Sequence, residues 1–93
     1  MDAAKAIAHY VLVLEHAAGA TARAEDRPGY TALLANAAPL LAVALGADTA
    51  QGLSTRLRQH EKLWGSLWLS GPAFQEASMA WQAAKAACNH AGV

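Results

Sequence analysis

The chain has 93 residues, the length of one domain, and 55% of them are hydrophobic, too many for a disordered chain. Its formal net charge is zero, so it lacks the positive surface typical of nucleic-acid binders. The single cysteine, Cys88, excludes an intramolecular disulfide and a cysteine-based zinc site, and it favours a reducing, cytoplasmic compartment. Alanine, the strongest helix former, is abundant, and no alternating strand pattern occurs. The sequence therefore predicts one all-α domain over residues 1–93, a small antiparallel bundle of about four helices.

The first predicted helix begins after Asp2, which can cap it, and runs to about Ala24. Apolar side chains recur at helical spacing and predict its inward stripe: Ile7, Tyr10, Val11, Leu14 and Ala18. A second, mixed face carries Leu12 between His9 and His16. This helix therefore presents apolar surface on more than one side.

The second predicted helix begins near Pro28 or Tyr30, after a charged break, and ends at Gly46. It is apolar all round, so we expect it to be the most buried helix. Pro39 lies inside it, and proline removes a backbone hydrogen bond and clashes with the preceding turn. The helix should therefore be kinked or broken near Pro39. Its expected core residues are Leu33, Leu34, Ala37, Leu41 and Leu45.

Two membrane interpretations are alternatives to a soluble bundle. Residues 28–47 are uncharged and numerous enough to cross a bilayer, but their alanine content, Asn36 and Pro39 favour a buried helix. Residues 1–20 end in small residues that mimic a signal-peptide cleavage site, but Asp2 and the polar residues that follow argue against export. We therefore expect no membrane association.

The third predicted helix begins at Asp48-Thr49-Ala50-Gln51, which is close to a capping box. Ser70-Gly71-Pro72 marks the turn into the fourth helix, and Pro72 suits its first position. The inward stripes should be Leu53, Leu57, His60, Trp64 and Leu67 or Trp68 in the third helix, and Phe74, Ala77, Trp81, Ala84 and Cys88 in the fourth. Across the bundle, the side chains expected to be almost fully buried are Leu14, Leu34, Leu41, Leu57 and Trp81.

The residues that could carry chemistry do not form a known catalytic or metal motif. His9 and His16 share a helix face but lie two turns apart, too far to ligate one ion unaided. No glycine-rich phosphate loop or nucleophile motif occurs, and Cys88 lies on an apolar stripe typical of an inert thiol. We therefore expect no enzyme activity, no metal and no cofactor.

One segment resembles a known family. Residues 30–45, followed by a polar helix ending in His60-Glu61-Lys62-Leu63-Trp64, are similar to the flagellin-synthesis regulators of the FlaF type. Those proteins also have a helical segment leading into a polar residue, two basic residues and a Leu-Trp pair. The resemblance covers about a third of the chain, Glu61 replaces one of the basic residues, an additional helix precedes the segment, and the ending differs. We make no family assignment from it.

The tryptophans all fall in the second half of the chain. We expect Trp64 and Trp81 to pack in the core, which leaves Trp68 and Leu69, with Leu12 from the first helix, as candidates for contact with another chain. The predicted function is therefore a non-catalytic interaction module that forms a homodimer or binds a protein partner, and that binds no nucleic acid.

An alternative function is a small-ligand-binding or sensory bundle. Its apolar pocket would be lined by Tyr10, Trp64 and Trp81, near the distortion at Pro39. The abundance of alanine also suggests a GC-rich, bacterial source.

Overall fold

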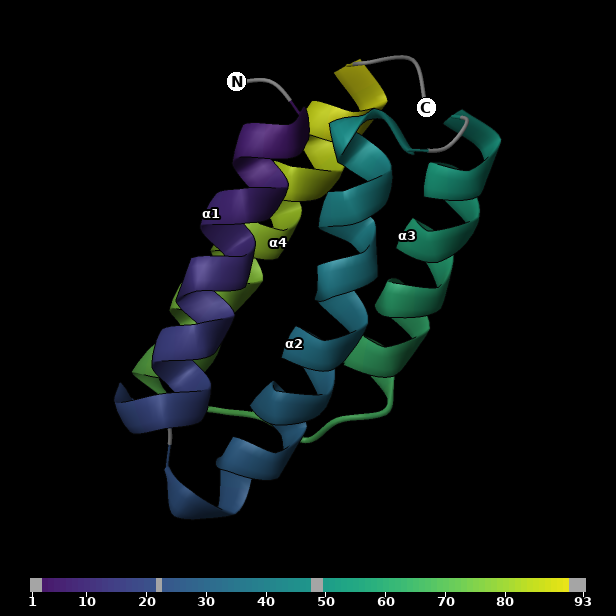
Figure 1. Ribbon diagram of the computed structural model, residues 1–93. Coiled ribbons are helices and arrows are strands. Elements are labelled where there is room, and N and C mark those ends of the chain that lie inside the picture. The colour runs from purple at the N-terminus through teal and green to yellow at the C-terminus, as the bar shows by residue number, and fades with distance from the viewer. Residues whose placement is uncertain (1–2, 22, 48–49, 91–93) are drawn as a thin grey trace.

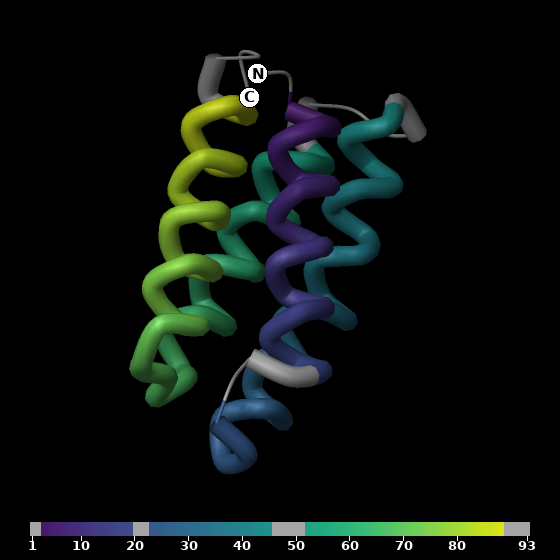
Figure 2. The backbone as a smooth tube through the Cα atoms, turned by 90° about the vertical axis from the view of Figure 1, so that its left-hand side faces the viewer, coloured from purple at the N-terminus to yellow at the C-terminus, as the bar shows by residue number. Residues whose placement is uncertain are grey.

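The computed structural model describes residues 3–21, 23–47 and 50–90, which form four α-helices and contain no strand. The helices are α1 (Ala3–His16), α2 (Arg27–Ala42), α3 (Ala50–Gly65) and α4 (Pro72–His90). They run alternately down and up, so that helices consecutive in sequence are antiparallel (Figure 1). α1 packs against both α4 and α2, and α2 packs against α3; seen from the side, α1 lies between α4 and α2 (Figure 2). The predicted all-α bundle is confirmed.

The backbone geometry of the second helix changes just after Pro39. α2 continues through Pro39 to Ala42, and the chain then forms a π-helical turn, Val43–Ala47. Because proline has no N–H, the carbonyl of Ala35 loses its helical partner. The predicted break near Pro39 is confirmed, but it follows the proline, and Ala38 stays α-helical.

Only one side of α2 is buried, so the expectation that it is the most buried helix is wrong. Leu34 and Leu41, which we expected to be almost fully buried, are only half-buried, and Leu45, which we expected in the core, is 70% exposed. The apolar residues on the outer face are alanines and prolines, and alanine counts as hydrophobic in a sequence but removes little area from water when covered. The buried side chains of α2 are Tyr30, Leu33, Ala37 and Leu40.

The helical stretch Ala24–Leu45 is long and apolar enough to cross a membrane by length and composition, and 28% of the segment that passes this test is buried in the bundle. Length and composition do not distinguish a membrane span from an alanine-rich helix at the surface of a bundle.

The core is built around large side chains from all four helices. Leu14 and Trp81 are fully buried as expected, whereas Leu57 is half-buried, so its predicted full burial is wrong. His60 and Cys88 are completely buried. The remaining fully buried large side chains are Ile7, Tyr10, Tyr30, Leu33 and Leu40.

The connection from α1 to α2 is held by a short-range ion pair. Asp26 is buried, and its carboxylate accepts from the Arg23 guanidinium, with Nε 3.1 Å from Oδ2 and Nη2 3.4 Å from Oδ1. The backbone N–H of Asp26 also donates to the carbonyl of Arg23 at 2.9 Å. Pro28 then lies in the first turn of α2, where a missing N–H costs nothing.

The connection from α3 to α4 closes one end of the bundle. Gly71 has φ of +90°, a conformation that favours glycine, and Pro72 begins α4 as predicted. Leu69 packs on the first turn of α2, where a Cβ on Gly29 would lie 3.1 Å from its Cδ2. The predicted helix caps Asp2, Asp48 and Thr49 lie outside the described residues.

Candidate functional site

A hydrogen-bonded chain of polar side chains crosses the core and joins three helices. The indole N–H of Trp64 donates to the hydroxyl oxygen of Tyr10 at 2.7 Å. The Tyr10 hydroxyl lies 2.5 Å from Nε2 of His60, and Nδ1 of His60 lies 2.6 Å from Oδ1 of Asn36. The chain therefore links α3 to α1, returns to α3 and ends on α2.

One arrangement of protons satisfies every member of this chain. The Asn36 oxygen can only accept, so His60 carries its proton on Nδ1 and donates it there. His60 Nε2 is then an acceptor, and the Tyr10 O–H donates to it while the hydroxyl oxygen accepts from Trp64. This arrangement requires a neutral imidazole. Burial keeps the imidazole neutral, because desolvation lowers the pKa of His60 to about 4. The nearby Glu61 charge acts to raise this pKa, but its effect is smaller.

Tyr10, His60 and Asn36 have the order of a nucleophile, a base and an orienting amide. The Tyr10 hydroxyl cannot serve as a nucleophile here, because Tyr10 is completely buried and no substrate atom can reach it. Desolvation also raises the pKa of Tyr10 well above its ordinary value, and this outweighs the opposing effect of the Trp64 hydrogen bond. The cluster therefore joins the helices, and its polar atoms fix how they pack.

A second polar contact joins α3 to α4 at the edge of this cluster. The Trp81 indole N–H donates to Oε2 of Glu61 at 2.6 Å, and Nζ of Lys85 lies 3.1 Å from the same oxygen. Burial acts to raise the pKa of Glu61, but the hydrogen bonds from Trp81 and Lys85 and the Lys85 charge outweigh it, so the pKa is lowered. The Lys85 ammonium also lies 5.6 Å from the centre of the Trp81 ring.

The structure brings together Tyr10, Trp64 and Trp81, the three residues of the alternative ligand pocket. Tyr10 and Trp81 have ring centres 5.3 Å apart, and His60 packs edge-on against both. Trp64 joins this group through its hydrogen bond to the Tyr10 hydroxyl. The pockets described below are lined by other side chains, and whether a small ligand binds near this cluster stays a prediction.

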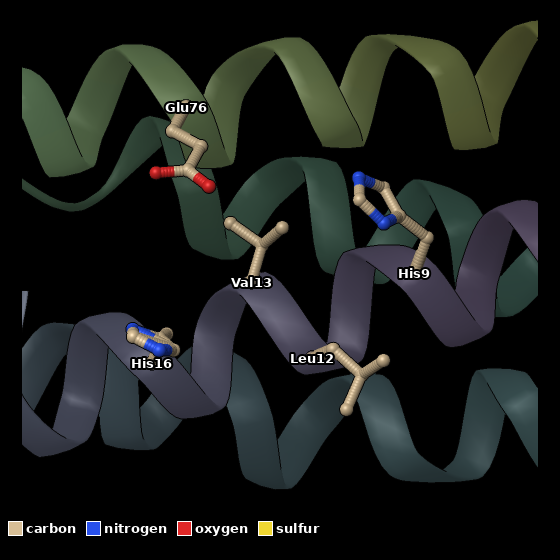
Figure 3. A pocket seen from close by; sticks show the side chains of 5 residues that line it. All are labelled: His9, Leu12, Val13, His16 and Glu76. Carbon is tan, nitrogen blue, oxygen red and sulfur yellow. The ribbon is translucent and has the colours of Figure 1, made fainter.

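Two adjoining hollows lie on the surface between α1 and α4, with volumes of about 390 and 340 Å³. His9 from α1 and Glu76 from α4 line both. In Figure 3, Glu76 and Val13 point toward one another across the gap between the helices, and Leu12 projects from α1 on the side away from α4. We call this surface the α1–α4 face; its residues are His9, Leu12, Val13, His16, Glu76, Met79, Ala80 and Ala83.

The three residues predicted to contact a partner lie in different environments. Leu12 is 61% exposed and belongs to the α1–α4 face. Trp68 is 95% exposed in the α3–α4 connection. Leu69 is half-buried because it packs against the start of α2, so less of its side chain is open to another chain.

The remaining titratable groups do not assemble into a metal site among the described residues, where no cluster of three or more histidine, cysteine or acidic side chains could hold an ion. His9 and His16 are exposed, while His60 is buried and bonded through both ring nitrogens. The side chain of His90 lies outside the described part. Cys88 is buried, and desolvation raises the pKa of its thiol, which disfavours the reactive thiolate.

Sequence reasoning placed His60 on an inward stripe but missed its partners. A histidine at core spacing and a lone Asn36 in an uncharged helix were the available signals, yet neither shows that the two side chains meet. The α4 half of the α1–α4 face was also missed. Met79 is three residues from Glu76, but only the packing of α4 shows which way it points.

No protein-family model, curated protein or solved structure matches this chain, and the resemblance to flagellin-synthesis regulators gains no support from these comparisons. The fold and the site define it as a four-helix bundle with a polar chain centred on the buried Tyr10 and His60 and with an exposed two-helix face.

Proposed function

We propose that this chain is a non-catalytic helical interaction module that associates with a second copy of itself. The observation that carries the proposal is the exposure of two large apolar side chains on neighbouring helices, Leu12 on α1 and Met79 on α4, which are 61% and 74% exposed and border adjoining hollows. Apolar side chains gathered on a small domain mark contact sites for other proteins. The groups best suited to chemistry, on Tyr10, His60 and Cys88, are buried. Two-fold dimers are also the commonest assemblies of soluble proteins.

Trp68 supports the same proposal from a separate part of the surface. An almost completely exposed tryptophan leaves a large apolar ring in water, and tryptophan is enriched among residues that dominate binding energy. Trp68 is therefore a second candidate contact, and the variants described below separate it from the α1–α4 face.

Light scattering coupled to size-exclusion chromatography tests the proposal directly. A chain of 9.7 kDa should give twice that mass at high micromolar concentration and move toward the single-chain mass on dilution. A single-chain mass throughout that range contradicts self-association. If Trp68→Glu alone abolishes the dimer, the contact lies in the α3–α4 connection.

The proposal includes a cytoplasmic location without membrane association. It is supported by the lone buried thiol and by the helical packing of α2 against α1 and α3. Flotation with lipid vesicles tests it, because the exposed alanine face of α2 is the surface that would enter a bilayer. The protein should stay in the vesicle-free fraction, and co-flotation with neutral vesicles contradicts this part of the proposal.

A further inference from the structure

Resting on the proposed self-association, we infer that the α1–α4 face is the dimer interface, and that α1 of each copy packs antiparallel on α4 of the other. The interface is therefore a second four-helix arrangement, formed by α1 and α4 from two copies. Three features of the face lead to this arrangement: the spacing of its residues, its relief and its charges.

The residues of the face have the spacing by which one helix packs on another. On α1 they are separated by three, four and seven positions, and on α4 the same spacing recurs. Residues so spaced lie along one side of a helix and form the stripe that a partner helix covers. The α1 stripe is His9, Leu12, Val13 and His16, and the α4 stripe is Glu76, Met79, Ala80 and Ala83. Two neighbouring antiparallel helices therefore each present a packing stripe outside the core.

The relief of the face combines protruding side chains with hollows. Leu12 and Met79 are largely exposed, while Val13 and Ala80 are buried. Leu12 borders one hollow and Met79 the other, and the two hollows adjoin. A surface with both features can fit itself when two-fold symmetry presents each protrusion to a hollow on the other copy.

The charges on the face select one of the two ways in which it can meet itself. If α1 met α1, imidazole would face imidazole and the two Glu76 carboxylates would approach one another. If α1 meets α4, His9 and His16 of one copy face the helix that carries Glu76 in the other, so that imidazole N–H groups oppose a carboxylate. Because α1 and α4 are antiparallel within one chain (Figure 1), a two-fold axis along the helices also makes the contacting helices antiparallel. That is the usual packing of helix bundles.

Two charge-introducing variants test the location of the interface. Leu12→Glu and Met79→Glu each place a carboxylate within the face, and each should raise the dimer dissociation constant about tenfold or more by analytical ultracentrifugation. The matched control is Leu45→Glu, because Leu45 is equally exposed but lies beyond α2, and it should leave the constant unchanged. A wild-type dimer that persists in both variants overturns this interface but leaves self-association standing. A wild-type monomer overturns both.

Disulfide trapping tests the orientation, and it uses milder substitutions that keep the bundle folded. In a Cys88→Ala background, a mixture of Leu12→Cys and Met79→Cys chains should form a cross-linked dimer under mild oxidation, because these positions lie on different helices that meet between copies. Each variant alone should cross-link far less. Efficient cross-linking of Leu12→Cys with itself overturns the α1-on-α4 arrangement, and so does the absence of any cross-link in the mixture.

Discussion

The Tyr10 hydroxyl holds the central position in the buried polar chain, because it donates to His60 and accepts from Trp64. Removing it leaves the buried Nε2 of His60 and the partly buried N–H of Trp64 without this partner, and a polar atom left unpaired away from water costs the desolvation that its hydrogen bond had offset. The second buried tyrosine, Tyr30, differs in this respect, since its hydroxyl has no hydrogen-bond partner among the described residues. The two tyrosines therefore form a natural pair for comparison.

We expect Tyr10→Phe to lower the free energy of unfolding by about 1–3 kcal/mol. Tyr30→Phe should change it by less than about 0.5 kcal/mol or raise it slightly, because no hydrogen bond is lost. Urea denaturation followed by circular dichroism measures both values. Equal losses in the two variants would show that the Tyr10 hydrogen bonds contribute nothing specific.

His60 makes stability depend on pH. Its folded pKa of about 4 lies below the ordinary value of 6.5, so the unfolded chain binds the proton more tightly. The stabilisation is complete above pH 6.5 and is lost as the pH falls toward 4. Between pH 7 and pH 5 the free energy of unfolding should drop by about 2 kcal/mol from this group. The pKa of Glu61 is lowered from 4.5, so the stability that Glu61 contributes is lost only below pH 5, outside this window.

The check is to measure unfolding at pH 7 and pH 5 in His60→Gln and in His9→Gln. His60→Gln should be less stable than the wild type at pH 7, but its free energy of unfolding should no longer decrease between pH 7 and pH 5. His9 is exposed, so His9→Gln should keep this decrease. A drop of unchanged size in His60→Gln would mean that another group titrates.

At the scale of the helix, α2 shows how little an apolar composition reveals about burial. Leu40 and Leu41 are adjacent, yet Leu40 is fully buried and Leu41 is half-buried. One step along a helix turns a side chain through about 100°, so neighbours face different surroundings. The sequence predicted Leu41 in the core. An uncharged helix has no polar face, so the sequence does not show which of its faces is buried.

We expect Leu40→Ala to cost about 2–5 kcal/mol, the range for a leucine removed from a closed core. Leu41→Ala should cost less than half as much, since water can reach the space it leaves. Both losses of unfolding free energy follow from the denaturant midpoints, provided that the slope of the free energy against denaturant concentration is the same in each variant. Equal costs for the two substitutions would contradict the rotation of α2 described here.

At the scale of the whole molecule, self-association and folding should be linked. A dimer is stabilised by its own concentration, so its melting temperature should rise as the protein is concentrated. In Leu12→Glu the rise should begin only at about tenfold higher concentration or above, while the melting temperature in dilute solution stays close to that of the wild type, because position 12 is exposed. Differential scanning calorimetry over a hundredfold range of concentration measures both. A melting temperature independent of concentration in the wild type would contradict the dimer.

Several features of this protein are determined by local sequence. Alanine content and helical spacing predicted the all-α bundle, Pro72 the start of α4, and Pro39 the nearby break, because each acts on its own or adjacent turns. The sequence also predicted the mixed face of α1, with Leu12 between two histidines, because residues seven apart share a side of a helix.

Other features were decided only by the tertiary structure. The contact between Tyr10 and His60 joins residues fifty positions apart, and no local pattern specifies which polar side chains will meet in a core. The inner side of α2 and the exposure of Met79 depend on how each helix is rotated against its neighbours, and the half-burial of Leu69 depends on how the α3–α4 connection packs on α2. That rotation is set by the fit of large side chains from all four helices at once, because a close-packed interior admits few arrangements.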